Sequence, residues 1–112
     1  MWTWEEVTER LSRYLDSSGS QLERNAQALL RIIPNIRNDE RFRALFPFLS
    51  MANLGLAIDR DVAASPRVII WSGDGTTYNL TDFAWSKGSD SPLTAEQLLD
   101  AVESKIQQLL NE

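Results

Sequence analysis

Four of the aspartates in the second half of the chain form the acidic cluster that could carry carboxylate or metal chemistry. Asp59 and Asp61 flank Arg60, and Asp74 and Asp82 follow on later segments. Calcium takes several oxygen ligands from a tightly spaced loop, but the Asp-x-Asp-x-Asp-Gly spacing of an EF-hand is absent. Glycoside hydrolysis needs two carboxylates across a sugar-sized cleft, for which a domain this small has little room. We therefore expect solvated loop carboxylates and no metal site.

Residues 72–77, Ser-Gly-Asp-Gly-Thr-Thr, have the composition of a phosphate-cradling loop. The loop lacks the Gly-Lys-Ser/Thr of a Walker motif, and it precedes a strand-like segment rather than a helix N-terminus. A hairpin turn explains it better, because glycines adopt the positive φ values that a tight reversal needs. No phosphate-bearing cofactor is expected.

Histidine and cysteine are both absent from the sequence. This composition excludes the commonest general base at neutral pH, thiolate nucleophiles, Cys-ligated metals and the Ser-His and Cys-His catalytic arrangements. We therefore assign no catalytic, cofactor-binding or metal-binding residue, and we expect a protein that is not an enzyme.

Length and charge indicate a single ordinary domain over residues 1–112. The chain has 43% hydrophobic residues, a net charge of −5 and no basic stripe, so a nucleic-acid partner is not expected. The charge would steer a basic protein partner to the surface at low salt, although mild acidity also keeps proteins soluble. The first six residues do not resemble a secretory signal, and no window approaches the ~20 apolar residues of a membrane span. The prediction is a cytoplasmic protein without a membrane partner.

Helical patterns occupy the first half of the chain. Thr3 with Glu6 and Ser20 with Glu23 have capping-box spacing, and apolar residues recur after each at three- and four-residue steps. Pro34 is expected to end the second helix, because proline lacks the N–H that a helix interior uses. The three predicted helices run from Trp4 to the break at residues 17–19, from Ser20 to Pro34, and from a cap at Asn38 to Pro47.

An antiparallel meander and a last helix are predicted for the second half. Apolar residues alternate from Leu54 to Ile58, residues 67–71 are β-branched and aromatic, and residues 77–81 form a third strand that residues 83–85 could extend. The small residues Gly55 and Ala57 are expected to receive a closely packed helix, or alternatively a ligand or partner. Thr94 with Gln97 forms a third capping box, so the last helix begins near residue 95.

A resemblance to a known family rests on two motifs. Residues 46–50 read Phe-Pro-Phe-Leu-Ser and lead towards a strand, and residues 73–78 read Gly-Asp-Gly-Thr-Thr-Tyr. This pattern resembles a poorly characterised bacterial family, known mainly from actinobacteria and often labelled natural product biosynthesis proteins. The match covers about a third of the chain, and the family's aromatic and basic residues after the first strand are not evident here. The resemblance implies a helix, meander, helix arrangement and brings no catalytic assignment.

Together these patterns predict an α+β domain with three N-terminal helices, about three antiparallel strands in meander order and a C-terminal helix. The leading functional hypothesis is a non-enzymatic, acidic protein-binding module, such as an immunity-type inhibitor, a chaperone or an adaptor. One alternative is a carboxylate-based enzyme or small-ligand protein that uses Asp59, Asp61 or Asp74 beside Trp71. Another is a self-associating structural subunit, which would be a homo-oligomer.

The surplus of tryptophan suggests where a partner would bind. Four tryptophans exceed what a core of this size requires, and aromatic residues are typical of interface hot spots. The alternative is that Trp71 belongs to the core and that Trp2 and Trp4 pack the first helix onto it. The predicted partner-contact residues are Trp2, Trp4, Trp71, Tyr78, Trp85, Asp59 and Asp61.

Overall fold

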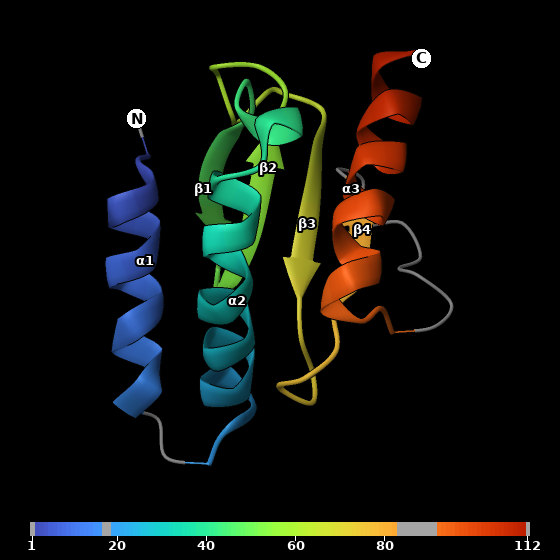
Figure 1. The fold of residues 1–112 in the computed structure, drawn as a ribbon. Coiled ribbons are helices and arrows are strands. Elements are labelled where there is room, and N and C mark those ends of the chain that lie inside the picture. Colours follow the sequence, from blue (N-terminus) through green and yellow to red (C-terminus); the bar gives the residue numbers. More distant parts are fainter. Residues whose placement is uncertain (1, 17–18, 83–91, 112) are drawn as a thin grey trace.

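The computed structural model shows three helices packed on one face of a four-stranded antiparallel sheet with strand order β1-β2-β3-β4 (Figure 1). It describes residues 2–16, 19–82 and 92–111. The elements are α1 (Trp4–Arg13), η1 (Tyr14–Asp16), α2 (Gln21–Arg37), η2 (Glu40–Phe42), β1 (Phe46–Ser50), β2 (Asn53–Ala57), β3 (Arg67–Trp71), β4 (Asn79–Asp82) and α3 (Ala95–Leu110). The α+β class is confirmed, but the sheet has four strands rather than three. No helix in the described ranges is both long and apolar enough to cross a membrane.

The predicted helix starts are confirmed by their caps. The Thr3 hydroxyl accepts a hydrogen bond from the Glu6 N–H at 3.1 Å, and the Ser20 hydroxyl accepts one from the Glu23 N–H at 3.1 Å. At α3 the capping box is complete, because the Thr94 and Gln97 side chains each accept from the other's backbone. Each cap satisfies N–H groups that the helix cannot pair internally.

The predicted end of the second helix at Pro34 is wrong. The helix α2 continues to Arg37, and Asn38 is its C-cap rather than the N-cap of another helix. The side chain of Pro34 is exposed, whereas Ile33 and Ile36 are buried in the core. Tertiary packing of these isoleucines therefore outweighs the hydrogen bond lost at the proline.

The predicted third helix is also wrong. Only a single 3-10 turn, η2, forms after Asp39, and residues 46–50 are the edge strand β1. An edge strand tolerates Pro47, because the N–H that proline lacks is not needed for pairing with a second neighbouring strand. The apolar residues around Pro47 alternate between the two faces of the sheet instead of following a helical stripe: Leu49 packs with the helix-side core and Phe48 with the opposite face. This strand is the one that the sequence analysis missed.

The predicted tight hairpin at residues 73–75 is a longer connection. Trp71 pairs with Asn79, so residues 72–78 lie between β3 and β4. Of the two glycines in this connection, Gly75 alone has a positive φ, 86°. Tyr78 extends the sheet by pairing with Leu93, with N–H to O distances of 2.8 and 2.7 Å. The suggested strand extension over residues 83–85 lies outside the described residues.

Hydrophobic residues bury both faces of the sheet. On the helix side, buried residues of β2 and β3 such as Leu54, Leu56 and Val68 join residues of all three helices in the main core. On the opposite face, Phe48, Ala57 and Ile69 form a smaller cluster. The helix expected against Gly55 is not found, because the Phe48 ring of the neighbouring strand occupies that space.

Candidate functional site

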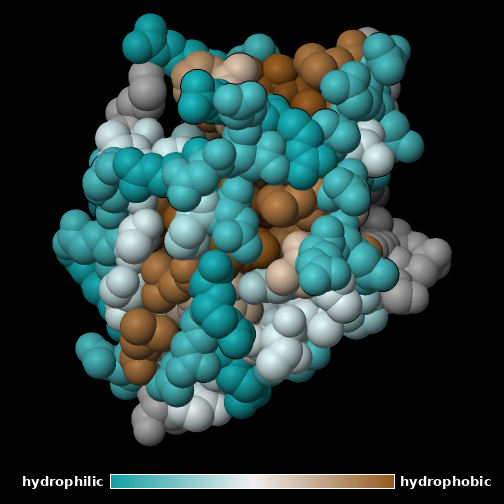
Figure 2. Space-filling view, viewed as in Figure 1, coloured by the Kyte–Doolittle hydropathy of each residue, from teal (hydrophilic) through white to brown (hydrophobic). Residues whose placement is uncertain are grey.

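Exposed apolar side chains are concentrated at one end of the molecule. The described residues include four large hydrophobic side chains with high exposure: Leu15 at 38%, Leu22 at 47%, Met51 at 87% and Leu110 at 55%. The first three belong to η1, the first turn of α2 and the β1–β2 turn, which lie towards the lower end in Figure 1. Leu110 ends α3 at the opposite end. Elsewhere the face shown in Figure 2 is mostly hydrophilic, with hydrophobic residues surfacing between the helices.

Met51 has an unusual backbone conformation. Ser50 pairs with Asn53, which leaves Met51 and Ala52 as a two-residue turn. The φ of Met51 is 59°, and among the described residues no other non-glycine residue has a positive φ. A positive φ at the first turn residue alone is the pattern of a type II′ turn, which favours glycine there. Methionine at this position is strained by about 1–2 kcal/mol.

Asn25 fixes the turn that carries Met51. Its side chain is 5% exposed, and its Nδ2 donates to the Ala52 carbonyl oxygen at 2.8 Å and to Asn53 Oδ1 at 3.3 Å. Its Oδ1 accepts from the Ser72 N–H at 2.8 Å. One buried amide thus joins α2, the β1–β2 turn and the end of β3. Met51 is therefore presented by a rigid turn.

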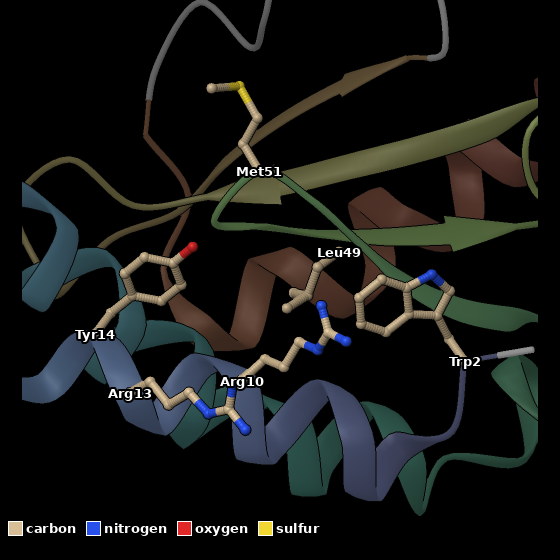
Figure 3. Close-up of a pocket in the computed structure, with 6 residues that line it drawn as sticks. All are labelled: Trp2, Arg10, Arg13, Tyr14, Leu49 and Met51. Atoms are coloured by element: carbon tan, nitrogen blue, oxygen red, sulfur yellow. The ribbon is translucent and has the colours of Figure 1, made fainter.

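Two hollows flank Met51. The first, of about 510 Å³, lies between α1 and β1 and is shown in Figure 3. The second, of about 290 Å³, lies between the start of α2 and the ends of β2 and β3. The first hollow is lined by Trp2, Arg10, Arg13, Tyr14, Leu49 and Met51. The second is lined by Gln21, Leu22, Asn25, Met51, Ala52, Asn53, Trp71 and Ser72. We call the first the α1–β1 groove, and we call Leu22, Met51 and Trp71 together the Met51 surface.

The α1–β1 groove carries positive charge on an acidic chain. The guanidinium carbon of Arg10 lies 4.9 Å from the centroid of the Trp2 ring, a cation–π contact. Arg13 pairs with Glu9 at 2.8 Å, and both side chains are well exposed. Within the part of the chain that the structure describes, no carboxylate forms an ion pair with Arg10.

Two of the predicted contact residues line these hollows. Trp2 is half-buried in the α1–β1 groove, and Trp71 is half-buried beside Met51. Trp4 is half-buried against the helix-side core, as expected if it packs the first helix onto that core. The structure therefore places Trp2 and Trp71 in two different hollows, each of which Met51 also lines.

The other predicted contact residues lie elsewhere. Tyr78 is a core residue, 2% exposed, whose hydroxyl donates to the Ala28 carbonyl oxygen at 2.7 Å, and burial raises its pKa. Asp59 and Asp61 are exposed on the β2–β3 connection, at the opposite end of β2 from the Met51 turn. Trp85 lies outside the described residues. Tyr78, Asp59 and Asp61 therefore do not form a site with Trp2 and Trp71.

Sequence reasoning missed Met51, Leu22 and Arg10. The apolar pattern after Ser20 does not distinguish Leu22 from the buried residues of the same helix, but Leu22 is half-exposed. The position of Met51 could be found only by recognising two strands on either side of it, and the helix expected up to Pro47 concealed the first of these strands. No local signal marks Arg10, since its partner Trp2 is separated from it by two turns of helix.

The loop at residues 72–77 satisfies its own backbone. Asp74 Oδ1 accepts from the N–H groups of Thr76 and Thr77, each at 2.8 Å, and Oδ2 accepts from the Thr77 hydroxyl at 2.7 Å. The Ser72 hydroxyl accepts from the Gly75 N–H at 2.9 Å. These bonds, led by that from the Thr77 N–H, hold the pKa of Asp74 well below its usual range. The N–H groups of Thr76 and Thr77, which a phosphate-binding loop would direct at its ligand, are therefore already paired with Asp74.

In the described ranges, no group of three or more carboxylates is placed to hold a metal ion. Comparisons with protein-family models, with curated proteins and with solved structures find no match to this chain.

Proposed function

We propose that this protein is a non-enzymatic protein-binding module whose contact site is the Met51 surface. The observation that carries the proposal is Met51 itself, which is 87% exposed and held at a φ of 59°. Exposure of a large apolar side chain and a left-handed backbone are both unfavourable for the isolated fold. Both costs are offset if the side chain is buried against a partner.

The neighbours of Met51 suit a contact site. Leu22 and Trp71 line the same hollow, and tryptophan and methionine are enriched in interface cores. Burying one such side chain fully contributes about 1.5–3 kcal/mol. Since Asn25 already fixes the turn, little conformational entropy is lost on binding.

The carboxylate-based alternative draws no support from the positions of its residues. Asp59 and Asp61 lie on the β2–β3 connection, whereas Asp74 lies on the β3–β4 connection. These connections are at opposite ends of the sheet (Figure 1). Asp74 is therefore too far from Asp59 and Asp61 to share a substrate with either as acid and base, and Asp59 and Asp61 are exposed at the end of β3 opposite Trp71.

Site-specific photo-crosslinking in the cells that encode the protein tests the proposal. A photoreactive phenylalanine replaces Met51, and a matched variant carries it at Ala63, which is exposed on the β2–β3 connection. We expect a discrete adduct of defined mass at position 51 and none at position 63. Equal labelling at both positions, or no adduct at position 51, would contradict the proposal.

A pair of leucine substitutions supplies a second control. Leu22→Ser and Leu110→Ser each remove an exposed leucine, at 47% and 55% exposure, from opposite ends of the molecule. We expect Leu22→Ser to weaken capture of the crosslinked partner about tenfold, since a buried aliphatic contact contributes about 1.5 kcal/mol. Leu110→Ser should leave capture unchanged.

A further inference from the structure

The α1–β1 groove combines features that the Met51 surface lacks. Its walls carry two guanidiniums, from Arg10 and Arg13, and its apolar parts come from Trp2, Leu49 and Met51. Figure 3 shows the Arg10 side chain extending between α1 and β1 towards the Trp2 ring, with Met51 at the tip of the turn. The groove thus combines apolar side chains with two positive charges from α1.

The charges in the groove are available for a partner. Arg10 is held by the Trp2 ring rather than by a carboxylate. The Arg13–Glu9 pair is exposed at 69% and 66%, and such surface pairs contribute at most about 1 kcal/mol. Arginine binds carboxylates through two parallel hydrogen bonds, and it can do so while stacked on an aromatic ring.

The dimensions of the groove suit a short peptide segment. The helix α1 has 10 residues, which span about 15 Å at a rise of 1.5 Å per residue. An extended peptide of about five residues covers that length. Pro47 in the adjacent strand has no N–H to donate, so side-chain contacts rather than extension of the sheet must provide most of the affinity.

We propose that the α1–β1 groove binds an acidic peptide segment of the partner protein, with carboxylates at Arg10 and Arg13 and an apolar side chain between Trp2 and Leu49. This inference rests on the proposed function, because the groove shares Met51 with the contact surface. Charge complementarity selects the occupant. A nucleic acid would bring a long run of phosphates to a chain with net charge −5, whereas a short acidic segment brings only a few carboxylates, which the two guanidiniums can neutralise.

The test is selection of peptides from a random phage-displayed library on the intact protein. Counter-selection uses the double variant Arg10→Gln/Arg13→Gln, which removes both charges and keeps the three side-chain carbons and a polar end group. We expect enriched sequences that combine Asp or Glu with an aliphatic or aromatic residue. A synthetic peptide of the enriched sequence should bind the wild type about tenfold more tightly than the double variant in calorimetric titration, as expected for two charge-assisted contacts.

Matched variants distinguish binding in the groove from a general effect of net charge on binding. Arg43→Gln/Arg60→Gln changes the net charge equally at two exposed positions outside the groove, and it should bind the peptide like the wild type. A peptide analogue with Asn and Gln in place of Asp and Glu should bind about tenfold more weakly than the acidic peptide. Circular dichroism spectra establish that each variant is folded.

Three results would overturn the inference: no enriched peptide, enriched peptides without an acidic bias, or equal binding to the wild type and to the groove variant. These failures are distinct from failure of the proposed function. If crosslinking at position 51 captures a partner while the peptide selection fails, the protein binds its partner through the Met51 surface without an acidic segment in the groove.

Discussion

The ring of Phe48 lies directly on the backbone of Gly55, its cross-strand partner in the β1–β2 hairpin. A Cβ atom at position 55 would stand 2.2 Å from the ring Cζ, closer than any van der Waals contact permits. Arg67 in turn lies over the same ring, with its guanidinium carbon 5.6 Å from the centroid. The ring of Phe48 therefore fills the space above the glycine on the sheet face opposite the helices.

Gly55→Ala should destabilise the protein by about 1–3 kcal/mol, because the added methyl group displaces the Phe48 ring from a packed position. Urea unfolding followed by fluorescence measures the loss. Phe48→Leu should make the same alanine less costly, since the smaller side chain can move aside. Equal costs of Gly55→Ala with phenylalanine and with leucine at position 48 would show that the ring is not the cause.

Gly73→Ala is the matched control for Gly55→Ala. A Cβ at position 73 would lie 3.7 Å from the Gln21 side-chain nitrogen, an ordinary contact. We expect its free energy of unfolding to stay within about 0.5 kcal/mol of the wild type.

Local signals in the sequence predicted the starts of α1, α2 and α3 and three of the four strands. Capping pairs such as Thr94 with Gln97 act within one turn, so their effect is readable without the fold. Residues 67–71 are equally clear, because β-branched and aromatic residues suit a buried strand. Such features need no knowledge of distant neighbours.

Errors arose where distant packing decides the structure. Pro34 ends a helix by local rules, but burial of Ile36 carries α2 past it. Gly55 indicated a close approach correctly, yet only the strand register shows that Phe48 is the approaching group. The candidate site was likewise predicted only in part. Trp2 and Trp71 were predicted from their residue type, but the exposure of Met51 depends on the β1–β2 hairpin, which the sequence did not reveal.

Asn25→Ala should destabilise the protein by about 1–3 kcal/mol, because it leaves the buried Ser72 N–H without its acceptor and the Ala52 carbonyl without its donor. The measurement is the free energy of unfolding in urea. Asn35→Ala, at an exposed position of α2, should change that free energy by less than about 0.5 kcal/mol.

Asn25→Asp should make stability depend on pH. The new carboxylate would face the Ala52 carbonyl oxygen in a buried site, so its folded-state pKa is raised above the unfolded value of about 3.9. Stability relative to the wild type is then greatest below about pH 4 and falls as the pH rises through the raised pKa. A variant that loses stability on acidification instead would contradict this account of Asn25.

Asp74 should stabilise the fold only while it is ionised. Its folded-state pKa lies below the unfolded value because the Thr77 and Thr76 groups donate to the carboxylate. Its contribution is therefore present above about pH 4 and is lost as the pH falls through the folded-state pKa. The difference in urea midpoint between the wild type and Asp74→Asn should shrink on acidification below pH ~4.

The hydrogen bonds of Asp74 can be ranked by carbon-detected NMR titration of its carboxyl group. Thr77→Val removes the hydroxyl that donates to Oδ2 and should raise the Asp74 pKa towards its ordinary value. Thr76→Val keeps the backbone N–H that donates to Oδ1, so its effect should be smaller. A larger shift for Thr76→Val than for Thr77→Val would refute this ranking.

Met51→Gly should stabilise the folded protein and weaken partner binding at the same time. Glycine adopts a φ of 59° without strain, so the substitution relieves about 1–2 kcal/mol. This gain exceeds the cost of about 0.5–1 kcal/mol that comes from the greater entropy of glycine in the unfolded chain. Met51→Ala keeps a Cβ at the same φ, so it should lose partner capture without the gain in stability. Urea midpoints of the two variants and their yields in the capture assay test both effects. If Met51→Gly were no more stable than Met51→Ala, the turn would be unstrained. A gain in stability together with loss of capture would show that the strained methionine is kept at this turn because it binds the partner.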